Sequence, residues 1–100
     1  MAASSENLVK KQIKKILDQH KVYHFSPYMA GMGRAGIPDI IACCNGFFLG
    51  IEAKSGKNKA TELQLRELER IRTAGGYAVV INEANMDELP ILLNKLMEQW

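Results

Sequence analysis

The stretch that decides the fold lies at residues 37–54, which read IPDIIACCNGFFLGIEAK. Asn45-Gly46 stands between two apolar runs within it. An Asn-Gly pair in that setting is the strongest short-range signal for a β-hairpin with a two-residue turn, because both turn positions need a positive φ angle. We therefore expect residues 37–44 and 47–54 to form two antiparallel strands.

The hairpin register brings charged side chains together. If Cys44 faces Phe47 across the turn, counting outwards places Asp39 directly opposite Glu52, with Cβ atoms roughly 5 Å apart. Lys54 falls on the same face, because side chains alternate along a strand. Like charges directly opposed destabilise a sheet, so we expect a cation, such as a divalent metal ion, between the two carboxylates.

The composition is that of an ordinary globular protein. The chain has 100 residues, 47% hydrophobic and 24% charged, so we expect residues 1–100 to form a single domain. Its net charge of +2 permits nucleic-acid binding without requiring it. No signal peptide or membrane-spanning run is visible, and the adjacent Cys43 and Cys44 should be buried free thiols on opposite faces of a strand. These features favour the cytoplasm and no membrane partner.

The first part of the chain carries helix and strand signals before a loop. A helix should begin near Ser4 or Ser5 and run to about His20. Its apolar stripe consists of Val9, Ile13, Ile16 and Leu17. Residues 22–25 have the composition of a short strand, and the Gly-rich and Met-rich residues 26–36 predict a loop.

The second part predicts a helix between two strands and then a last helix. Thr61 and Gln64 match a capping box, and Gly75-Gly76 should end that helix. Residues 77–81 should return to the sheet parallel to the second hairpin strand, as a right-handed βαβ unit. A last helix should begin near Asp87 and carry the apolar residues Leu92, Leu93, Leu96, Met97 and Trp100. The predicted order is αβββαβα, an α/β fold with a mixed sheet flanked by helices.

Two carboxylates and a lysine on one face are what metal-dependent hydrolysis of a phosphodiester requires. Mg²⁺ prefers oxygen ligands and takes one or two carboxylates from a protein, which matches Asp39 and Glu52. The main-chain carbonyl of Ala53 can add a neutral oxygen. Lys54 is placed to orient or deprotonate the attacking water and to stabilise charge in the transition state.

The spacing of Pro38-Asp39 and Glu52-Ala53-Lys54 resembles the motif of the PD-(D/E)XK nuclease superfamily. The closer resemblance is to its VRR-NUC family. That pattern combines a glutamate in the first helix, a Gly-rich approach to the aspartate, the Glu-x-Lys strand and a Thr-x-x-Gln helix. It covers residues 5–81.

The resemblance implies a restriction-endonuclease-like fold, with an αβββαβ core followed here by a C-terminal helix. It also implies Mg²⁺-dependent cleavage of DNA that leaves 5′-phosphates, with Mn²⁺ able to substitute. Small stand-alone members, often encoded by phages or prophages, are similar to dimeric Holliday junction resolvases. In larger proteins the domain acts on flaps or interstrand crosslinks.

Two residues have both a structural and a functional interpretation. Glu6 shares the inward face of the first helix, and the resemblance implies that it reaches the metal. A glutamate in the first turn is also favoured by the helix dipole alone. Gln64 can cap its helix through Thr61, or it can contact Lys54, the attacking water or the substrate as the resemblance implies.

Several side chains are candidates for contact with DNA. Arg34, Lys57 and Lys59 flank the carboxylates in sequence and are expected to bind phosphates, with solvated surface charge as the alternative. Tyr23 and Tyr28 can stack on unpaired bases, although half-buried packing is more common for tyrosine.

Other polar residues predict less. A basic run should lie on the outer side of the first helix, as a solvated face, with contact to DNA as the alternative. It consists of Lys10, Lys11, Lys14 and Lys15. His20 and His24 straddle the end of that helix, so their spacing does not favour a zinc pair.

The apolar positions of residues 91–100 exceed one narrow stripe, which predicts a homodimer. A dimer has two active sites, and symmetric cuts across a four-way junction need two. We therefore expect a nuclease for branched DNA, most simply a Holliday junction resolvase. The alternatives are a flap or duplex nuclease, a non-catalytic nucleic-acid-binding dimer, and a subunit that regulates another protein through the last helix.

Overall fold

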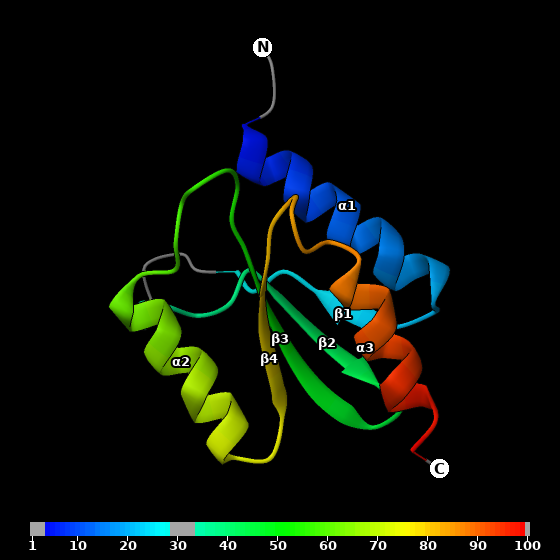
Figure 1. Cartoon of the computed structure of the whole chain (residues 1–100). Coiled ribbons are helices and arrows are strands. Elements are labelled where there is room, and N and C mark those ends of the chain that lie inside the picture. Colours follow the sequence, from blue (N-terminus) through cyan, green and yellow to red (C-terminus); the bar gives the residue numbers. More distant parts are fainter. Residues whose placement is uncertain (1–3, 29–33, 100) are drawn as a thin grey trace.

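The computed structural model describes residues 4–28 and 34–99, and the described elements follow the order αβββαβα (Figure 1). Their bounds are α1 Ser5–Gln19, β1 Tyr23–Phe25, β2 Ile40–Cys44, β3 Phe47–Ala53, α2 Glu62–Thr73, β4 Tyr77–Ile81 and α3 Glu88–Met97. The predicted element order is therefore confirmed.

The four strands form one mixed sheet in the order β1-β2-β3-β4. The pairs β1–β2 and β2–β3 are antiparallel, whereas β3 and β4 are parallel. Helix α2 makes the crossover between the two parallel strands, as the sequence predicts.

The hairpin between β2 and β3 has the register that the Asn-Gly turn predicts. Cys44 faces Phe47 across the turn, and Ile40 faces Ile51 at the far end of the pairing. The φ angles of Asn45 and Gly46 are 53° and 85°, both positive as a type I′ turn requires. One further step outwards from Ile40 and Ile51 places Asp39 opposite Glu52.

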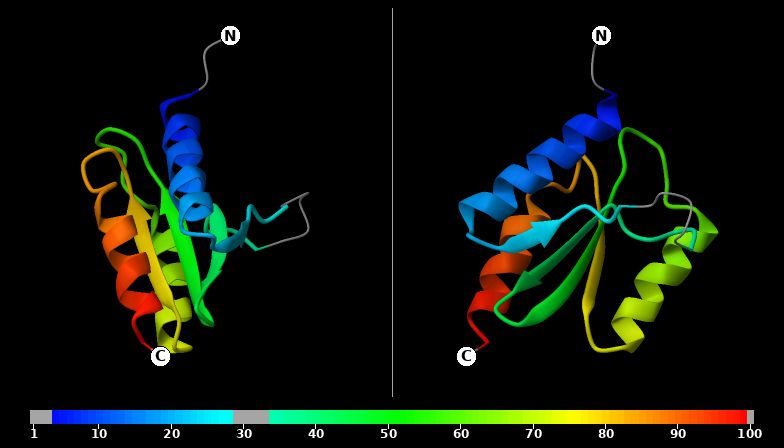
Figure 2. Two further views of the ribbon diagram at one scale, coloured as in Figure 1. Left: turned by 90° about the vertical axis from the view of Figure 1, so that its right-hand side faces the viewer. Right: turned by 180° about the vertical axis from the view of Figure 1, so that it is seen from behind.

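The helices cover the sheet from both sides, with α2 on the side opposite to α1 and α3 (Figures 1 and 2). The main core lies between the sheet and the pair α1 and α3. Its fully buried members include Ile13, Leu17, Ile40, Leu49, Ile51, Leu89 and Leu93. The predicted apolar stripe of α1 is buried in this core, and Leu68 of α2 is buried on the other side.

Strand β2 begins at Ile40, so the prediction that it starts at residue 37 is wrong. Pro38 has no N–H group to donate to a neighbouring strand. Asp39 replaces the missing main-chain pairing with its side chain, since Asp39 Oδ2 accepts a hydrogen bond of 2.8 Å from the Ala53 N–H. The end of β3 is thus tied to a carboxylate.

The two free cysteines point to opposite faces, as predicted, but only Cys44 is buried. Cys43 is exposed, because α2 packs against β3 and β4 and leaves the β1–β2 part of that face open. Trp100, expected in the last helix, lies outside the described residues. None of the described helices has the length and apolar character needed to cross a bilayer.

The substitution Gly36→Ala tests the close approach of the segment before β2 to α2. A Cβ atom on Gly36, whose φ is +86°, would lie 2.5 Å from the Leu63 carbonyl oxygen. Gly46 has φ +85°, and a Cβ there would meet nothing within 4 Å. We expect Gly36→Ala to lower the free energy of unfolding in urea by about 3 kcal/mol and the control Gly46→Ala by about 1 kcal/mol. Equal losses would contradict the close approach.

Candidate active site

Asp39 and Glu52 lie side by side at one end of the hairpin, Asp39 just before β2 and Glu52 near the end of β3. Asp39 is partly exposed and is held by the Ala53 N–H. Glu52 is 1% exposed, and within the described part of the chain its Oε1 atom is buried without a hydrogen-bond partner. A buried carboxylate oxygen without a partner is costly unless a cation or proton satisfies it.

Burial raises the pKa of Glu52 to about 8, and the negative charge of Asp39 and a hydrogen bond with it add to the rise. The positive charge of Lys54 acts in the opposite direction, and the charge of Glu6 adds slightly to the rise. Without a metal ion, Glu52 therefore holds a proton through much of the neutral range.

Lys54 lies directly after β3 and points at two carboxylates. Its Nζ atom is 3.6 Å from Glu52 Oε2 and 3.8 Å from Glu6 Oε1. The Lys54 side chain is mostly buried, and its main-chain N–H donates a 3.0 Å hydrogen bond to the Ile81 carbonyl. The structure thus brings Glu6, Glu52 and Lys54 together from α1 and the hairpin.

The donor set fits a magnesium site with two carboxylates. Asp39 and Glu52 are adjacent, and Glu52 Oε1, which no other described residue binds, offers a ligand atom. Residues 4–28 and 34–99 contain no cluster of three His, Cys, Asp or Glu side chains arranged to hold a metal. Glu6 contacts Lys54 and does not form a three-carboxylate cluster with Asp39 and Glu52. Direct binding of a metal by Glu6 therefore stays a prediction.

Lys10 is a site residue that the sequence interpretation missed. Its Nζ atom lies 3.5 Å from Asp39 Oδ1, so its placement on the outer side of the helix is wrong. Lys10 follows Glu6 by four residues, and positions four apart share a helix face. The four-residue spacing from Glu6 could therefore have predicted that Lys10 faces the site. The neighbouring Lys11 and Lys15 are exposed, as predicted.

Gln64 has the predicted structural role. Its Oε1 accepts a hydrogen bond of 2.8 Å from the Thr61 N–H, and its own N–H donates to Thr61 Oγ1 at 3.2 Å. The capping box at the start of α2 is therefore confirmed. Contact of Gln64 with Lys54, water or substrate stays a prediction.

Arg34 is anchored to helix α2. Its Nε atom donates a 2.9 Å hydrogen bond to Glu67 Oε1, and Arg70 donates to the other oxygen of Glu67, also at 2.9 Å. The sequence interpretation missed Glu67, which is 33 residues from Arg34. Lys57 and Lys59 are exposed. Phosphate binding by these three basic residues stays a prediction.

The two tyrosines and the two histidines that the sequence singled out differ in their surroundings. Tyr23 and Tyr28 are well exposed, so half-buried packing, the alternative to base stacking, is wrong. His20 Nδ1 is 2.9 Å from the Ile16 carbonyl oxygen, and His24 Nε2 is 2.7 Å from Asp18 Oδ1. The two imidazoles thus have separate partners.

The raised pKa of Glu52 predicts a pH-dependent stability of the metal-free protein. The folded state binds the Glu52 proton more tightly than the unfolded state, whose pKa is near 4.5. This stabilisation is complete below the unfolded pKa and is lost as the pH rises through the folded pKa. In EDTA we expect the free energy of unfolding to fall by about 3 kcal/mol between about pH 5 and pH 8.

Urea unfolding of Glu52→Gln checks this expectation, because the variant should lose most of the slope. The control Glu98→Gln removes an exposed carboxylate and should keep the wild-type slope. Mg²⁺ at pH 8 should raise the melting temperature of the wild type more than that of Glu52→Gln. A wild-type slope in Glu52→Gln would contradict the role of this buried carboxyl.

Comparison with known proteins supports a single family. The chain matches no family model and no curated protein. A solved structure titled "VRR_NUC domain" superposes with a TM-score of 0.70 and 26% sequence identity, over 98% of this chain and 99% of that one. A "VRR_NUC domain protein" has a TM-score of 0.68 and 20% identity, over 98% of this chain and 92% of that one.

The second structure shares the fold, and the first adds sequence identity over nearly the whole of both chains. The mixed sheet with flanking helices is the restriction-endonuclease-like fold that the sequence predicts. These relatives indicate a nuclease of the PD-(D/E)XK type. With the adjacent Asp39, Glu52 and Lys54 set on this fold, the similarity over nearly the whole of both chains supports membership of the VRR-NUC family.

Proposed function

We propose that the protein is a divalent-metal-dependent endonuclease that cleaves branched DNA, as a homodimeric Holliday junction resolvase. The observation that carries the proposal is the pair Asp39 and Glu52, held adjacent by the hairpin register with Lys54 beside it. One buried oxygen of Glu52 has no hydrogen-bond partner among the described residues. A cation bound between two adjacent carboxylates would reduce their mutual repulsion and would use the available oxygen as a ligand.

Asp39, Glu52 and the carbonyl of Ala53 are the proposed ligands of Mg²⁺, for which Mn²⁺ can substitute. When bound, the ion supplies an acidified water and polarises the scissile phosphate. Asp39 is oriented for this role by the Ala53 N–H, which fixes one of its oxygens at the end of β3. Glu52 must lose its proton, so the site exchanges a proton for the ion.

Lys54 and Gln64 are the remaining proposed catalytic residues. The Lys54 ammonium lies beside the carboxylates, where it can orient the attacking water and stabilise the negative charge that grows on the phosphate oxygens. Water loses a proton and adds to phosphorus, the bond to the 3′ oxygen breaks, and that oxygen takes up a proton. The products are a 5′-phosphate and a 3′-hydroxyl. Gln64 stands in the first turn of α2 and is proposed to contact the water or substrate.

The DNA is proposed to bind through basic side chains around the carboxylates. Arg34 precedes Asp39 by five residues, and Lys57 and Lys59 follow Lys54 in an exposed turn. Each can neutralise a backbone phosphate, which gives affinity without base specificity. A substrate with four arms spans more surface than one small chain offers, which favours two copies.

Helix α3 is the proposed dimer interface. Its residues Leu89, Leu93 and Leu96 are buried in the core, but Ile91 is 64% exposed and Met97 is also exposed. Large apolar side chains on the outer face of a terminal helix favour association. A two-fold dimer would supply the two active sites that paired cuts across a junction need.

A flap nuclease is a second candidate, favoured by exposed aromatic rings on the β1–β2 part of the sheet. Tyr23 and Phe25 are exposed, with ring centroids 6.2 Å apart in an edge-to-face arrangement. Exposed aromatic rings on a sheet are suited to stacking with unpaired bases, which flaps provide.

The resemblance to small members of the family is the basis for proposals on domain extent, genetic origin and cellular location. We propose that residues 1–100 make one VRR-NUC domain, that it is encoded by a phage or prophage, and that it acts in the cytoplasm of a bacterial host. This proposal agrees with the unpaired thiols of Cys43 and Cys44 in the structure.

Cleavage of an end-labelled four-way junction tests the activity. With Mg²⁺ we expect paired symmetric nicks that are lost in EDTA, and Asp39→Asn should lower the rate at least about a hundredfold, because it removes a charged ligand. The control Asp87→Asn changes an exposed aspartate that makes no capping hydrogen bond, and it should cut at the wild-type rate. Denaturing gels give the rates and the positions of the nicks.

The other outcomes separate the candidates. Preferential cutting of a flap or a plain duplex would replace the junction resolvase by a different structure-specific nuclease. Cleavage that survives EDTA or Asp39→Asn would contradict the metal mechanism. A folded protein that binds these DNAs but cuts none of them would leave the non-catalytic binding dimer.

Light scattering of the wild type and of Ile91→Glu tests the dimer. We expect the wild type to have the mass of two chains at micromolar concentration and Ile91→Glu to have the mass of one, because a charge in an apolar interface is costly. The control Leu8→Glu places the same charge at an exposed leucine of α1 and should remain dimeric. A wild-type protein with the mass of a single chain would rule out the α3 interface.

A further inference from the structure

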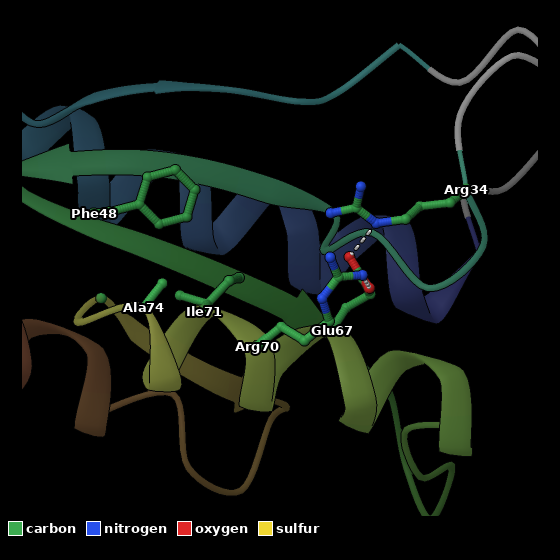
Figure 3. A pocket seen from close by; sticks show the side chains of 7 residues that line it. Arg34, Phe48, Glu67, Arg70, Ile71 and Ala74 are labelled. Atoms are coloured by element: carbon green, nitrogen blue, oxygen red, sulfur yellow. Dashed lines mark hydrogen bonds and ion pairs between the residues drawn. The ribbon is translucent and has the colours of Figure 1, made fainter.

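A pocket of about 440 Å³ opens between α2 and the sheet (Figure 3). Arg34, Glu67 and Arg70 form one end of it, and Phe48, Ile71 and Ala74 form the other. The size lies within the usual range for sites that bind small ligands. The pocket therefore joins a charged end to an apolar end.

The charged end is built on a buried carboxylate. Glu67 is almost fully buried, and its two oxygens accept hydrogen bonds from two different arginines, Arg34 and Arg70. The hydrogen bond from Arg34 is the largest cause that lowers the pKa of Glu67, so the carboxylate is charged. Two guanidinium groups against one carboxylate leave a net charge of +1.

Arg34 and Arg70 bind Glu67 but keep N–H groups available for a ligand. Their side chains are 62% and 57% exposed, and among the described residues Glu67 is the only side chain that accepts their hydrogen bonds. Each guanidinium has five N–H groups in a fixed plane, so several stay available to a ligand. One arginine would be enough to neutralise Glu67, and the second makes the cluster suited to a phosphate.

The apolar end presents an aromatic ring. Phe48 is 48% exposed, and Figure 3 shows its ring lying above Ile71 and Ala74, away from the guanidinium groups. Cross-strand pairing aligns Phe48 with Cys43 and Tyr23, so two exposed rings share one row across the sheet. Such rings stack on bases, but only on bases that are not paired in a duplex.

The pocket lies near the carboxylates but is separate from them. Phe48 and Glu52 are on the same face of β3, four residues apart, which is about 13 Å along an extended strand. Gly50 lies between them, where Ile71 and Pro38 fill the space that a side chain would occupy. A ligand in the pocket thus sits beside the bond to be cut and not on it.

We propose that this pocket binds one unpaired nucleotide of the DNA strand, with its phosphate on Arg34 and Arg70 and its base on Phe48. Glu67 is the positioning residue that holds the two guanidinium groups. The inference rests on the proposed function and narrows its substrate to branched DNA with an unpaired nucleotide close to the cut. A blunt duplex can place a phosphate there but no base.

Binding in EDTA, where no strand is cut, tests the pocket. The probes are a fluorescein-labelled oligodeoxythymidine and a blunt duplex, followed by fluorescence anisotropy. Phe48→Ala should weaken binding of the single strand about tenfold and leave the duplex unchanged. Phe48→Tyr should keep the affinity for the single strand. Equal effects of Phe48→Ala on both probes would overturn the proposal.

The substitution Glu67→Gln tests whether Glu67 positions the two arginines or only adds negative charge, because the two roles predict opposite changes in the affinity for single-stranded DNA. Removal of a negative charge near DNA should strengthen binding if only the net charge matters. Loss of the carboxylate that aligns Arg34 and Arg70 should weaken binding of the single strand, about fivefold. Tighter binding by a folded Glu67→Gln protein would overturn the proposal, and circular dichroism checks the folding.

Arg70→Gln and Arg66→Gln form a matched pair that does not depend on a buried substitution. Both remove one exposed arginine from α2, but only Arg70 lines the pocket. Arg70→Gln should weaken single-strand binding about fivefold and reduce the salt slope by about 0.7, whereas Arg66→Gln should change binding less than about twofold. Equal losses in the two variants would overturn the proposal.

Competition with thymidine monophosphate distinguishes a strand from a free nucleotide. If the pocket serves the DNA strand, millimolar mononucleotide should displace little of the bound oligodeoxythymidine. Complete displacement would point to a free nucleotide as the ligand and overturn the proposal. These binding assays do not depend on cleavage. If the protein cuts no DNA but the pocket variants weaken binding as expected, the proposed nuclease function is refuted and the pocket inference stands. Active nuclease without pocket effects would refute only this inference.

Discussion

The structure depends on one unfavourable contact, two carboxylates held side by side at the end of a hairpin. The register from the Asn45-Gly46 turn allows no other arrangement, because a slip by one residue would turn the core side chains of both strands outwards. Burial of Glu52 next to Asp39 is therefore the consequence of a well-packed sheet. The fold stabilises this contact with a proton on Glu52 and an N–H bond to Asp39.

Helix α1 completes the charge balance around that contact. Lys10 faces Asp39, while Glu6 and Glu52 flank Lys54, so two basic side chains lie beside the three acidic side chains of the site. A cation entering between Asp39 and Glu52 would compete with these lysines and with the Glu52 proton. Release of a lysine from a carboxylate would leave its ammonium group free for phosphate, which links cation binding to substrate binding.

The parts of the structure that local chemistry controls could be predicted from the sequence. The Asn-Gly turn, the Thr61–Gln64 capping box and the alternation along β3 give the register and the carboxylate pair. The Arg34–Glu67 pair could not be predicted, because 33 residues separate the partners and only tertiary packing unites them. The exposure of Cys43 had the same cause, since it depends on how much of the sheet α2 covers.

The segment before β2 is held at three points, and all three bear on the site. Arg34 is fixed to α2 through Glu67, Gly36 lies against the main chain of Leu63, and Asp39 is bound to the Ala53 N–H. Only short stretches of chain separate these points, so a displacement of Arg34 would be transmitted along the main chain to Asp39. A phosphate that pulls on Arg34 would therefore act on the position of the carboxylate, which couples recognition of the strand to the geometry of the proposed catalytic site.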